Sequence, residues 1–135
     1  MQDKWMGPER RETVRLELTV PVEYTLINDI RSTELSKRRR ASVTNISSRG
    51  VRIESDEIDD SLIEELYNGK IKIGLEMRLP DADVPLKALA KVAWLTKGWK
   101  EQDGRAKYVM GLEFVDITTA HQDLIRGYII DSYLK

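Results

Sequence analysis

Alternation of apolar and polar residues in several separate stretches is the feature that most limits the possible folds of this chain. In the longest stretch, from Val14 to Leu26, every second residue is apolar and most of the residues between are charged or polar. Shorter stretches with the same period lie at residues 41–44, 51–53, 71–79, 86–94 and 108–114. A period of two is typical of half-buried β-strands, so each stretch is predicted to be a strand with one apolar face.

Turn-forming residues separate these strands, and the sequence contains no internal repeat. Several short strands of this kind predict a mainly β fold, a small closed antiparallel β-barrel, because closure leaves no exposed strand edge. Pro21 has no amide hydrogen to donate, so the first strand should bend at this residue or lie on an edge there. Two polar segments, residues 28–36 and 97–104, are predicted to be loops.

Two segments have helical rather than strand character. Residues 61–67 form a short predicted helix after the second and third strands, and it ends at Asn68 and Gly69. Near the C-terminus, Thr119 and Gln122 have the spacing of a capping box, which predicts a helix start there. One apolar face of this helix is formed at helical spacing by Leu124, Ile125, Tyr128, Ile129 and Tyr133.

That apolar face must cover either an open end of the barrel or a partner chain, so the protein is expected to be a monomer or a homodimer. The chain is accordingly divided into a flexible lead or linker at residues 1–8, a β-barrel domain at residues 9–117 and a C-terminal helix at residues 118–135.

Composition limits the class of protein. A chain of 135 residues is long enough for one domain with its own core, and 41% hydrophobic with 33% charged residues is typical of a soluble globular protein. The chain contains no cysteine, which excludes disulfides and thiolate metal sites and suits a cytoplasmic location. No apolar run approaches the ~20 residues of a membrane span, and the N-terminus lacks the apolar core of a signal peptide. The formal net charge is -1, so a bound anion must be held by a local cluster.

Two local motifs stand out from this framework. Residues Asn45 to Gly50, Asn-Ile-Ser-Ser-Arg-Gly, interrupt the alternation and predict a β-hairpin with a short connection. In that turn Gly50 can take a positive φ, and Asn45 can hydrogen-bond its own backbone. The second motif, Arg10 to Arg15, carries three arginines where the first strand begins. A further basic run, Lys37 to Arg40, opens the strand that ends at Asn45; it is either a solvated strand end or a means of attracting an anion.

The two motifs together resemble the signature of the PilZ domain family, the bacterial receptor modules for cyclic di-GMP. That signature is Arg-x-x-x-Arg followed further along the chain by Asp/Asn-x-Ser-x-x-Gly. Arg11 and Arg15 match its first part, and Asn45, Ser47 and Gly50 match its second part. Neither half is specific alone, but both in this order, separated by one predicted strand, are much rarer.

The likeness extends from Glu9 to Asp116 and includes residues 108–114, which resemble the closing strand of the family. It implies a receptor that binds cyclic di-GMP and relays the signal to a downstream protein effector in motility, polysaccharide secretion or regulation. It also implies that the residue before the first motif arginine, here the basic Arg10, favours two stacked nucleotides per site, since two nucleotides carry four negative charges. The implied ligand site consists of Arg10, Arg11, Arg15, Asn45, Ser47 and Gly50.

The chemistry of cyclic di-GMP suits these residue types. Arginine supplies charge for the phosphates, a planar fork for guanine O6 and N7, and a flat surface for stacking. We therefore expect Arg11 and Arg15 to be the main contacts to guanine and phosphate. The Asn45 amide can both donate to and accept from a guanine edge. Ser47 is expected either to donate to a phosphate or to brace the turn, and Gly50 to provide backbone shape or close approach.

Nothing in the sequence resembles a catalytic set, so we expect a binding module and not an enzyme. There is no cysteine nucleophile, phosphate loop or metal cluster, and the only histidine, His121, is expected to be a surface or capping residue. One alternative is a PilZ-like protein-interaction module that does not bind nucleotide, although all the motif residues are present. Another is a barrel that binds RNA or single-stranded DNA, which needs stacking aromatics, whereas aromatic residues make up only 7% of the chain.

Overall fold

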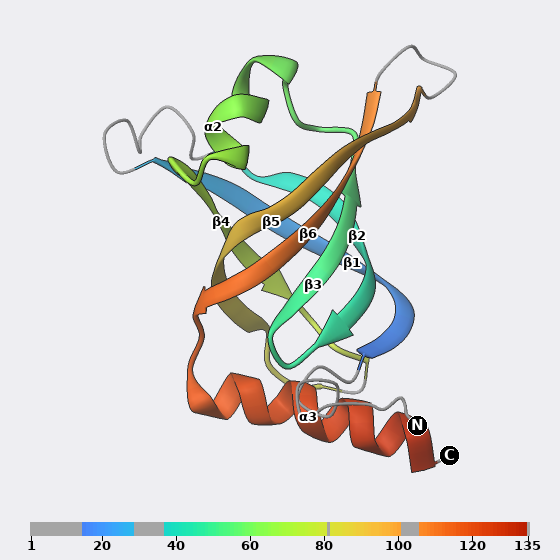
Figure 1. The fold of residues 1–135 in the computed structure, drawn as a ribbon. Coiled ribbons are helices and arrows are strands. Elements are labelled where there is room, and N and C mark those ends of the chain that lie inside the picture. The colour runs from blue at the N-terminus through green and yellow to red at the C-terminus, as the bar shows by residue number, and fades with distance from the viewer. Residues whose placement is uncertain (1–14, 29–36, 81, 101–105, 135) are drawn as a thin grey trace, which may run out of the picture.

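The computed structural model of the chain describes residues 15–28, 37–80, 82–100 and 106–134. Its elements follow in the order β1 Arg15–Asn28, β2 Arg39–Ser47, β3 Gly50–Ser55, η2 Asp60–Leu62, α2 Ile63–Tyr67, β4 Ile71–Met77, β5 Leu86–Lys100, β6 Ala106–Asp116 and α3 Thr119–Leu134. The strands pair antiparallel in the order β1-β2-β3-β6-β5-β4 and close into a barrel (Figure 1). The predicted mainly β fold, a small closed antiparallel barrel with a short helix and a C-terminal helix, is confirmed.

The apolar faces of the strands point inward and form one core. In β4, for example, every second residue is at most 2% exposed, as the period-two pattern predicts. Burying one such side chain contributes about 1.5–3 kcal/mol, so this core supplies most of the stabilisation of the barrel. Ile125 and Ile129 of α3 belong to the same core cluster. The helix α3 therefore covers one end of the barrel, and α2 lies at the opposite end (Figure 1).

Pro21 lies at a position of β1 that pairs with a neighbouring strand on one side only. It pairs with Ser42 on the β2 side, whereas the pairing of β1 with β4 begins only at Val22. On the β4 side Pro21 thus lies just outside the paired region, which agrees with the predicted edge position.

Strand β5 is longer than the sequence pattern predicts. The predicted loop at residues 97–104 is wrong in its first part, because β5 continues to Lys100. Lys97 pairs with Tyr108 on β6, and Lys100 pairs with Ala106. Cross-strand pairing provides partners for backbone groups whatever the side chains are, so a polar segment that contains glycine can still extend a strand.

The short helix ends as predicted, whereas the predicted cap of α3 is wrong. Gly69 follows α2 with a positive φ of 85°. At the start of α3 the capping residue is Thr118 and not Thr119: the His121 N–H donates to Thr118 Oγ1 at 3.1 Å. Gln122 does not complete a capping box, because its side-chain amide donates to the Ser48 carbonyl at 3.0 Å.

The apolar face of α3 is buried only along its centre. Ile125 and Ile129 are buried and Tyr128 packs partly against the core, but Leu124 is 39% exposed and Tyr133 is 62% exposed. Leu124 and Tyr133 lie toward the sides of the buried stripe, which explains why a five-residue face is covered only in part. The predicted lead at residues 1–8 lies outside the described residues, so the predicted domain limits stay a prediction.

Candidate functional site

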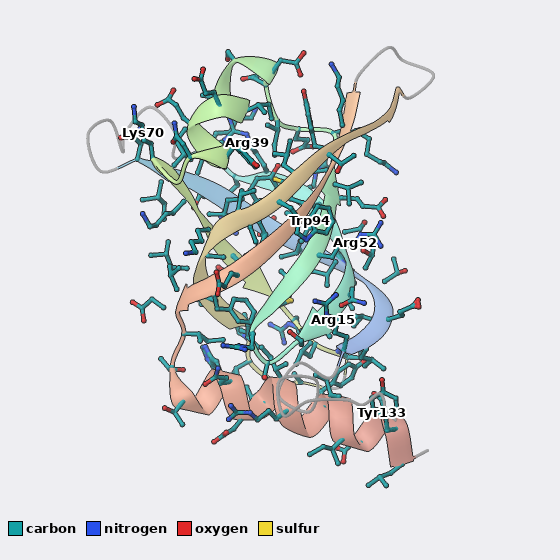
Figure 2. The ribbon with its side chains drawn as sticks, viewed as in Figure 1. Arg15, Arg39, Arg52, Lys70, Trp94 and Tyr133 are labelled. Atoms are coloured by element: carbon teal, nitrogen blue, oxygen red, sulfur yellow. The ribbon has the colours of Figure 1, made fainter. Side chains whose placement is uncertain are left out.

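A groove of about 560 Å³ lies on the outer face of the barrel wall. Its lining comes from β1, β2, β3, β5 and β6 and includes Arg15, Asn45, Ser47, Arg49, Gly50, Arg52, Trp94, Gly111 and Glu113. Figure 2 shows Arg15, Arg52 and Trp94 along one side of the molecule. The groove faces solvent, because Arg52 and Trp94 are exposed, whereas Val51, next to Arg52, and Val92, two residues before Trp94, are buried.

Strand pairing brings the two sequence motifs together. Arg15 lies opposite Ser47 across β1 and β2, and Glu17 lies opposite Asn45. Of the predicted site residues, Arg15, Asn45, Ser47 and Gly50 therefore line one groove. Arg10 and Arg11 lie outside the described residues. Ligand binding by all six residues stays a prediction.

A β-bulge in β2 turns Asn45 toward the groove. Val43 pairs with Ile53 and Asn45 pairs with Arg52, so Thr44 is an extra residue on β2. Strict alternation from Val43 would point Asn45 into the core. The extra residue shifts the alternation, so that Val43 and Ile46 are both buried and Asn45 lies between them on the outer wall.

The hairpin turn is braced by serine and not by asparagine. Ser48 and Arg49 connect β2 to β3. The Arg49 N–H donates to Ser47 Oγ at 3.2 Å, and the Ser47 hydroxyl donates to the Gly50 carbonyl at 3.4 Å. Among the described residues, no turn hydrogen bond involves the Asn45 side chain, so the expected Asn45 bond to its own backbone is not observed. The Asn45 amide is left to face the groove.

The turn is also held from outside, by two separate segments. The Phe114 N–H on β6 donates to the Arg49 carbonyl at 2.9 Å. The Ser48 carbonyl accepts the bond from Gln122 of α3. Ser48 is buried and Arg49 is exposed. A buried backbone carbonyl needs a protein partner, so these bonds fix the hairpin against both the barrel and the helix.

Gly50 is required for close approach and not for a positive φ. Gly69 is the glycine with positive φ in the described part of the chain, so Gly50 does not use the positive φ that its sequence position allows, and close approach is the alternative that the structure supports. A Cβ at Gly50 would lie 2.0 Å from the Leu112 carbonyl oxygen. Strand β6 therefore packs so closely beside the turn that no side chain fits.

Trp94 is a groove residue that the sequence pattern assigned to the core. A second bulge explains this error: Val92 pairs with Leu112 but Trp94 pairs with Gly111, so Ala93 is an extra residue on β5. The Trp94 indole then lies on the outer wall, 44% exposed, directly over Gly111, where a Cβ would be 2.1 Å from Trp94 Nε1. A tryptophan facing a glycine across two strands is a signal that could have pointed to this arrangement.

The groove contains cations without neutralising partners. Among the described residues, neither the Arg15 nor the Arg52 guanidinium forms a hydrogen bond or an ion pair. The carboxylate in the groove, Glu113, pairs instead with Lys91 at 3.6 Å. Two uncompensated guanidinium groups in one groove favour the binding of an anion.

The arginines of the basic run at residues 37–40 form contacts outside the groove. Arg38 pairs with Glu23 and Glu76, and Arg40 donates to Glu57. The Arg40 backbone N–H and side chain lower the pKa of the Glu57 carboxyl, the backbone bond having the larger effect. Arg39 is only 6% exposed. None of these arginines lines the groove, so the run has structural contacts at the other end of β2.

Fold and groove together define the class of protein: a small antiparallel β-barrel domain with a polar, arginine-containing groove on its outer wall. The chain belongs to the PilZ domain family, whose sequence profile matches residues 9–131. The family predicted from the two motifs is thereby confirmed. No curated protein matches the sequence.

Solved structures with the same fold include bacterial regulators. The Bacillus subtilis inhibitor of motility MotI/DgrA is 21% identical, with a TM-score of 0.63, and the match covers 93% of this chain and 52% of that one. The PilZ domain of YcgR from Escherichia coli, solved with c-di-GMP, is 11% identical, with a TM-score of 0.61 and 90% of each chain covered. MrkH from *K. pneumonia*, in its apo state, is 13% identical, with a TM-score of 0.65, and 96% of this chain and 52% of that one are covered. This chain thus spans about half the length of MotI/DgrA and of MrkH.

Within the described ranges, no group of three or more histidine, cysteine, aspartate or glutamate side chains could hold a metal ion. In the same part of the chain, none of the helices has the length and apolar character needed to cross a membrane.

Proposed function

We propose that this protein is a second-messenger receptor that binds cyclic di-GMP in the groove on the barrel wall. The observation that carries the proposal is that Arg15 lies opposite Ser47 and lines the same groove as Asn45 and Gly50. Membership of the PilZ family supports it. The PilZ domain of YcgR, which has the same fold, was solved with this nucleotide.

Each side chain in the groove has a proposed role. Arg15, with Arg11 and Arg10 from the preceding segment, contacts phosphate and the guanine O6 and N7 atoms. Asn45, turned outward by its bulge, hydrogen-bonds a guanine edge. Ser47 already braces the turn on both sides, so its role is to position the turn. Trp94 offers a flat, half-exposed ring on which a base can stack.

We also propose that two nucleotides occupy the site, because Arg10 adds a cation beside the first motif arginine. Two stacked nucleotides carry four phosphate charges, and additional arginine reduces their repulsion. Calorimetric titration of the purified chain should give two nucleotides per chain at saturation. A ratio of one would contradict this part of the proposal.

The protein acts as a binding module that relays the signal by a shift in conformation, with a downstream protein effector as the receiver. Helix α3 is the element suited to this relay. Gln122 near its start donates to the Ser48 carbonyl, and Tyr133 near its end donates to the Arg15 carbonyl at 2.5 Å. The helix therefore contacts the backbone of both motifs. A ligand that reorders either motif also changes the hydrogen bonds that hold the helix in place.

Titration of the wild-type chain and of Arg15→Ala with cyclic di-GMP tests the proposal. Removing one partner of a buried charge pair typically costs ~2–5 kcal/mol, so the variant should lose most of its affinity. Arg78→Ala is a matched control: Arg78 is exposed, donates to the Asp83 carbonyl, and lies outside the groove. Unchanged binding in Arg15→Ala would rule out the role of this residue.

Two further outcomes distinguish the rival functions. A folded wild-type chain that shows no binding of cyclic di-GMP would favour a protein-interaction module that does not bind nucleotide. Comparable binding of a short oligonucleotide at physiological salt would favour a nucleic-acid-binding barrel.

A further inference from the structure

We propose that Glu113 recognises the Watson–Crick edge of guanine and makes the groove reject cyclic dinucleotides that contain adenine. This inference rests on the proposed function and adds to it a residue that selects the base. Glu113 lies outside both sequence motifs, on β6, opposite Gly50.

The position of Glu113 gives it access to a bound base. It lines the groove together with Arg15, Asn45 and Trp94. The residue paired with it across the strands, Gly50, has no side chain to stand between the carboxylate and the floor of the groove. Its side chain is 51% exposed, so the carboxylate remains accessible.

A carboxylate in this groove needs an explanation. The proposed ligand is an anion, and a negative charge beside it lowers affinity. Glu113 also does not neutralise the groove arginines, because the described cation within ion-pair distance is Lys91, at 3.6 Å. That pair is half exposed on both sides, and exposed pairs of this kind contribute little to stability. A contribution to fold stability therefore does not account for the residue.

The hydrogen-bonding pattern of guanine supplies the explanation. Guanine presents two neighbouring donors on its Watson–Crick edge, N1–H and the N2 amino group, and a carboxylate can accept from both at once. Arginine complements the neighbouring Hoogsteen edge through O6 and N7. Adenine has no N2 amino group and places an acceptor at N1, which a carboxylate repels. The groove thus offers an arginine to the Hoogsteen edge of guanine, the Glu113 carboxylate to its Watson–Crick edge and the Trp94 ring to its face.

Affinities of cyclic di-GMP and cyclic di-AMP for wild type, Glu113→Ala and Glu113→Gln test the inference. Good bidentate recognition discriminates between bases by roughly 5- to 150-fold, so Glu113→Ala should lower the preference for the guanine ligand by about that factor. Affinity for cyclic di-GMP should fall, whereas affinity for cyclic di-AMP should stay the same or rise. A glutamine amide can accept from one of the two guanine donors and can also donate to adenine N1. Glu113→Gln should therefore also reduce the preference for cyclic di-GMP over cyclic di-AMP.

The ratio of the affinities for cyclic di-GMP and cyclic di-AMP distinguishes base recognition by Glu113 from simple charge repulsion. If Glu113 acted only through its charge, its removal would strengthen the binding of both dianions equally and leave their ratio unchanged. That result would overturn the inference. Absence of cyclic di-GMP binding to the wild-type chain would instead overturn the proposed function, so the two failures are distinguishable.

Glu54→Gln is the matched control. Glu54 lies on the neighbouring strand β3 and pairs with Lys107 at 3.4 Å, much as Glu113 pairs with Lys91, but it does not line the groove. This variant should keep the wild-type ratio of affinities. Lys91→Gln removes the partner of Glu113 while keeping its carboxylate, and it should keep the preference for guanine as well.

Discussion

Trp94 and Gly111 show how two single residues shape the floor and side of the groove. The indole lies where a side chain at Gly111 would stand, and it is the exposed aromatic residue among the groove lining. A flat ring in the same groove as Arg15 and Arg52 offers a stacking surface for a purine base, and such stacking contributes about 1–3 kcal/mol per base.

Trp94→Ala should therefore weaken the binding of cyclic di-GMP by about 1–3 kcal/mol. The free energy of unfolding should fall as well, because more than half of the side chain is covered where it packs over Gly111. Calorimetric titration together with urea unfolding measures both quantities. Tyr67→Ala, which removes a 64% exposed aromatic residue of α2 outside the groove, should leave affinity unchanged. Equal affinity of the Trp94→Ala variant and the wild type would exclude stacking on Trp94.

Substitution of glycine by alanine should have opposite effects on stability at Gly50 and at Gly127. A methyl group at Gly50 would overlap the Leu112 carbonyl, and overpacking of this kind typically costs about 1–3 kcal/mol. At Gly127, within α3, nothing lies within 4 Å of the added carbon. Gly127→Ala should therefore raise the free energy of unfolding by roughly 0.5–1 kcal/mol, and Gly50→Ala should lower it. Urea unfolding measures both, and a stable Gly50→Ala variant would contradict the close approach of β6.

Among the elements, α3 is the one that hydrogen-bonds to the backbone of both motif segments. Its centre is anchored in the core through Ile125 and Ile129, while Gln122 and Tyr133 contact the two motif segments. A helix fixed at its centre and bonded near both ends to the segments of the proposed ligand site is placed to respond when those segments change.

Cyclic di-GMP should change amide hydrogen exchange in the second half of α3, and Tyr133→Phe should reduce that change. The variant removes the hydroxyl that donates to the Arg15 carbonyl and keeps the ring. Ser132→Ala is the matched control, because the Ser132 hydroxyl donates to the Tyr128 carbonyl within the same helix. A ligand-induced change of equal size in Tyr133→Phe would show that this hydrogen bond does not carry the signal.

For the molecule as a whole, stability at high pH depends on a buried tyrosine. Burial raises the pKa of Tyr24 from 10.0 to about 12. The unfolded chain therefore ionises this phenol first, and stability is fully present below pH 10 and falls as the pH rises toward 12. The loss from this residue amounts to about 2–3 kcal/mol when the pH reaches the higher value.

Tyr24→Phe should remove that part of the alkaline loss. At pH 7 the variant should be less stable by about 0.5–1.5 kcal/mol, because it loses the 2.7 Å hydrogen bond between Tyr24 and Ser55. Urea unfolding at pH 7, 10 and 11 measures the difference. Tyr67→Phe, at an exposed position, should follow the wild-type curve. Parallel curves for Tyr24→Phe and wild type would contradict the pKa of Tyr24.

Sequence periodicity predicted the barrel and both helices because side-chain burial follows local pattern, as in residues 71–77. The length of β5 could not be predicted in the same way, because pairing with β6 and not its own composition extends it to Lys100. The motifs predicted that Arg15 and Asn45 belong to one site, and the structure brings them into one groove. Trp94 and Glu113 were missed, since a bulge decides the direction of the first and strand order brings the second beside Gly50.

The extra residue at Thr44 has a consequence for comparing relatives of this protein. It makes the exposure of Asn45 depend on the number of residues in β2 as much as on their identity. A relative that kept every residue here but paired this strand without the bulge, in strict alternation from Val43, would carry its asparagine inside the barrel. Inheritance of this binding surface is therefore better judged by counting positions between buried anchors such as Val43 and Ile46 than by matching letters alone.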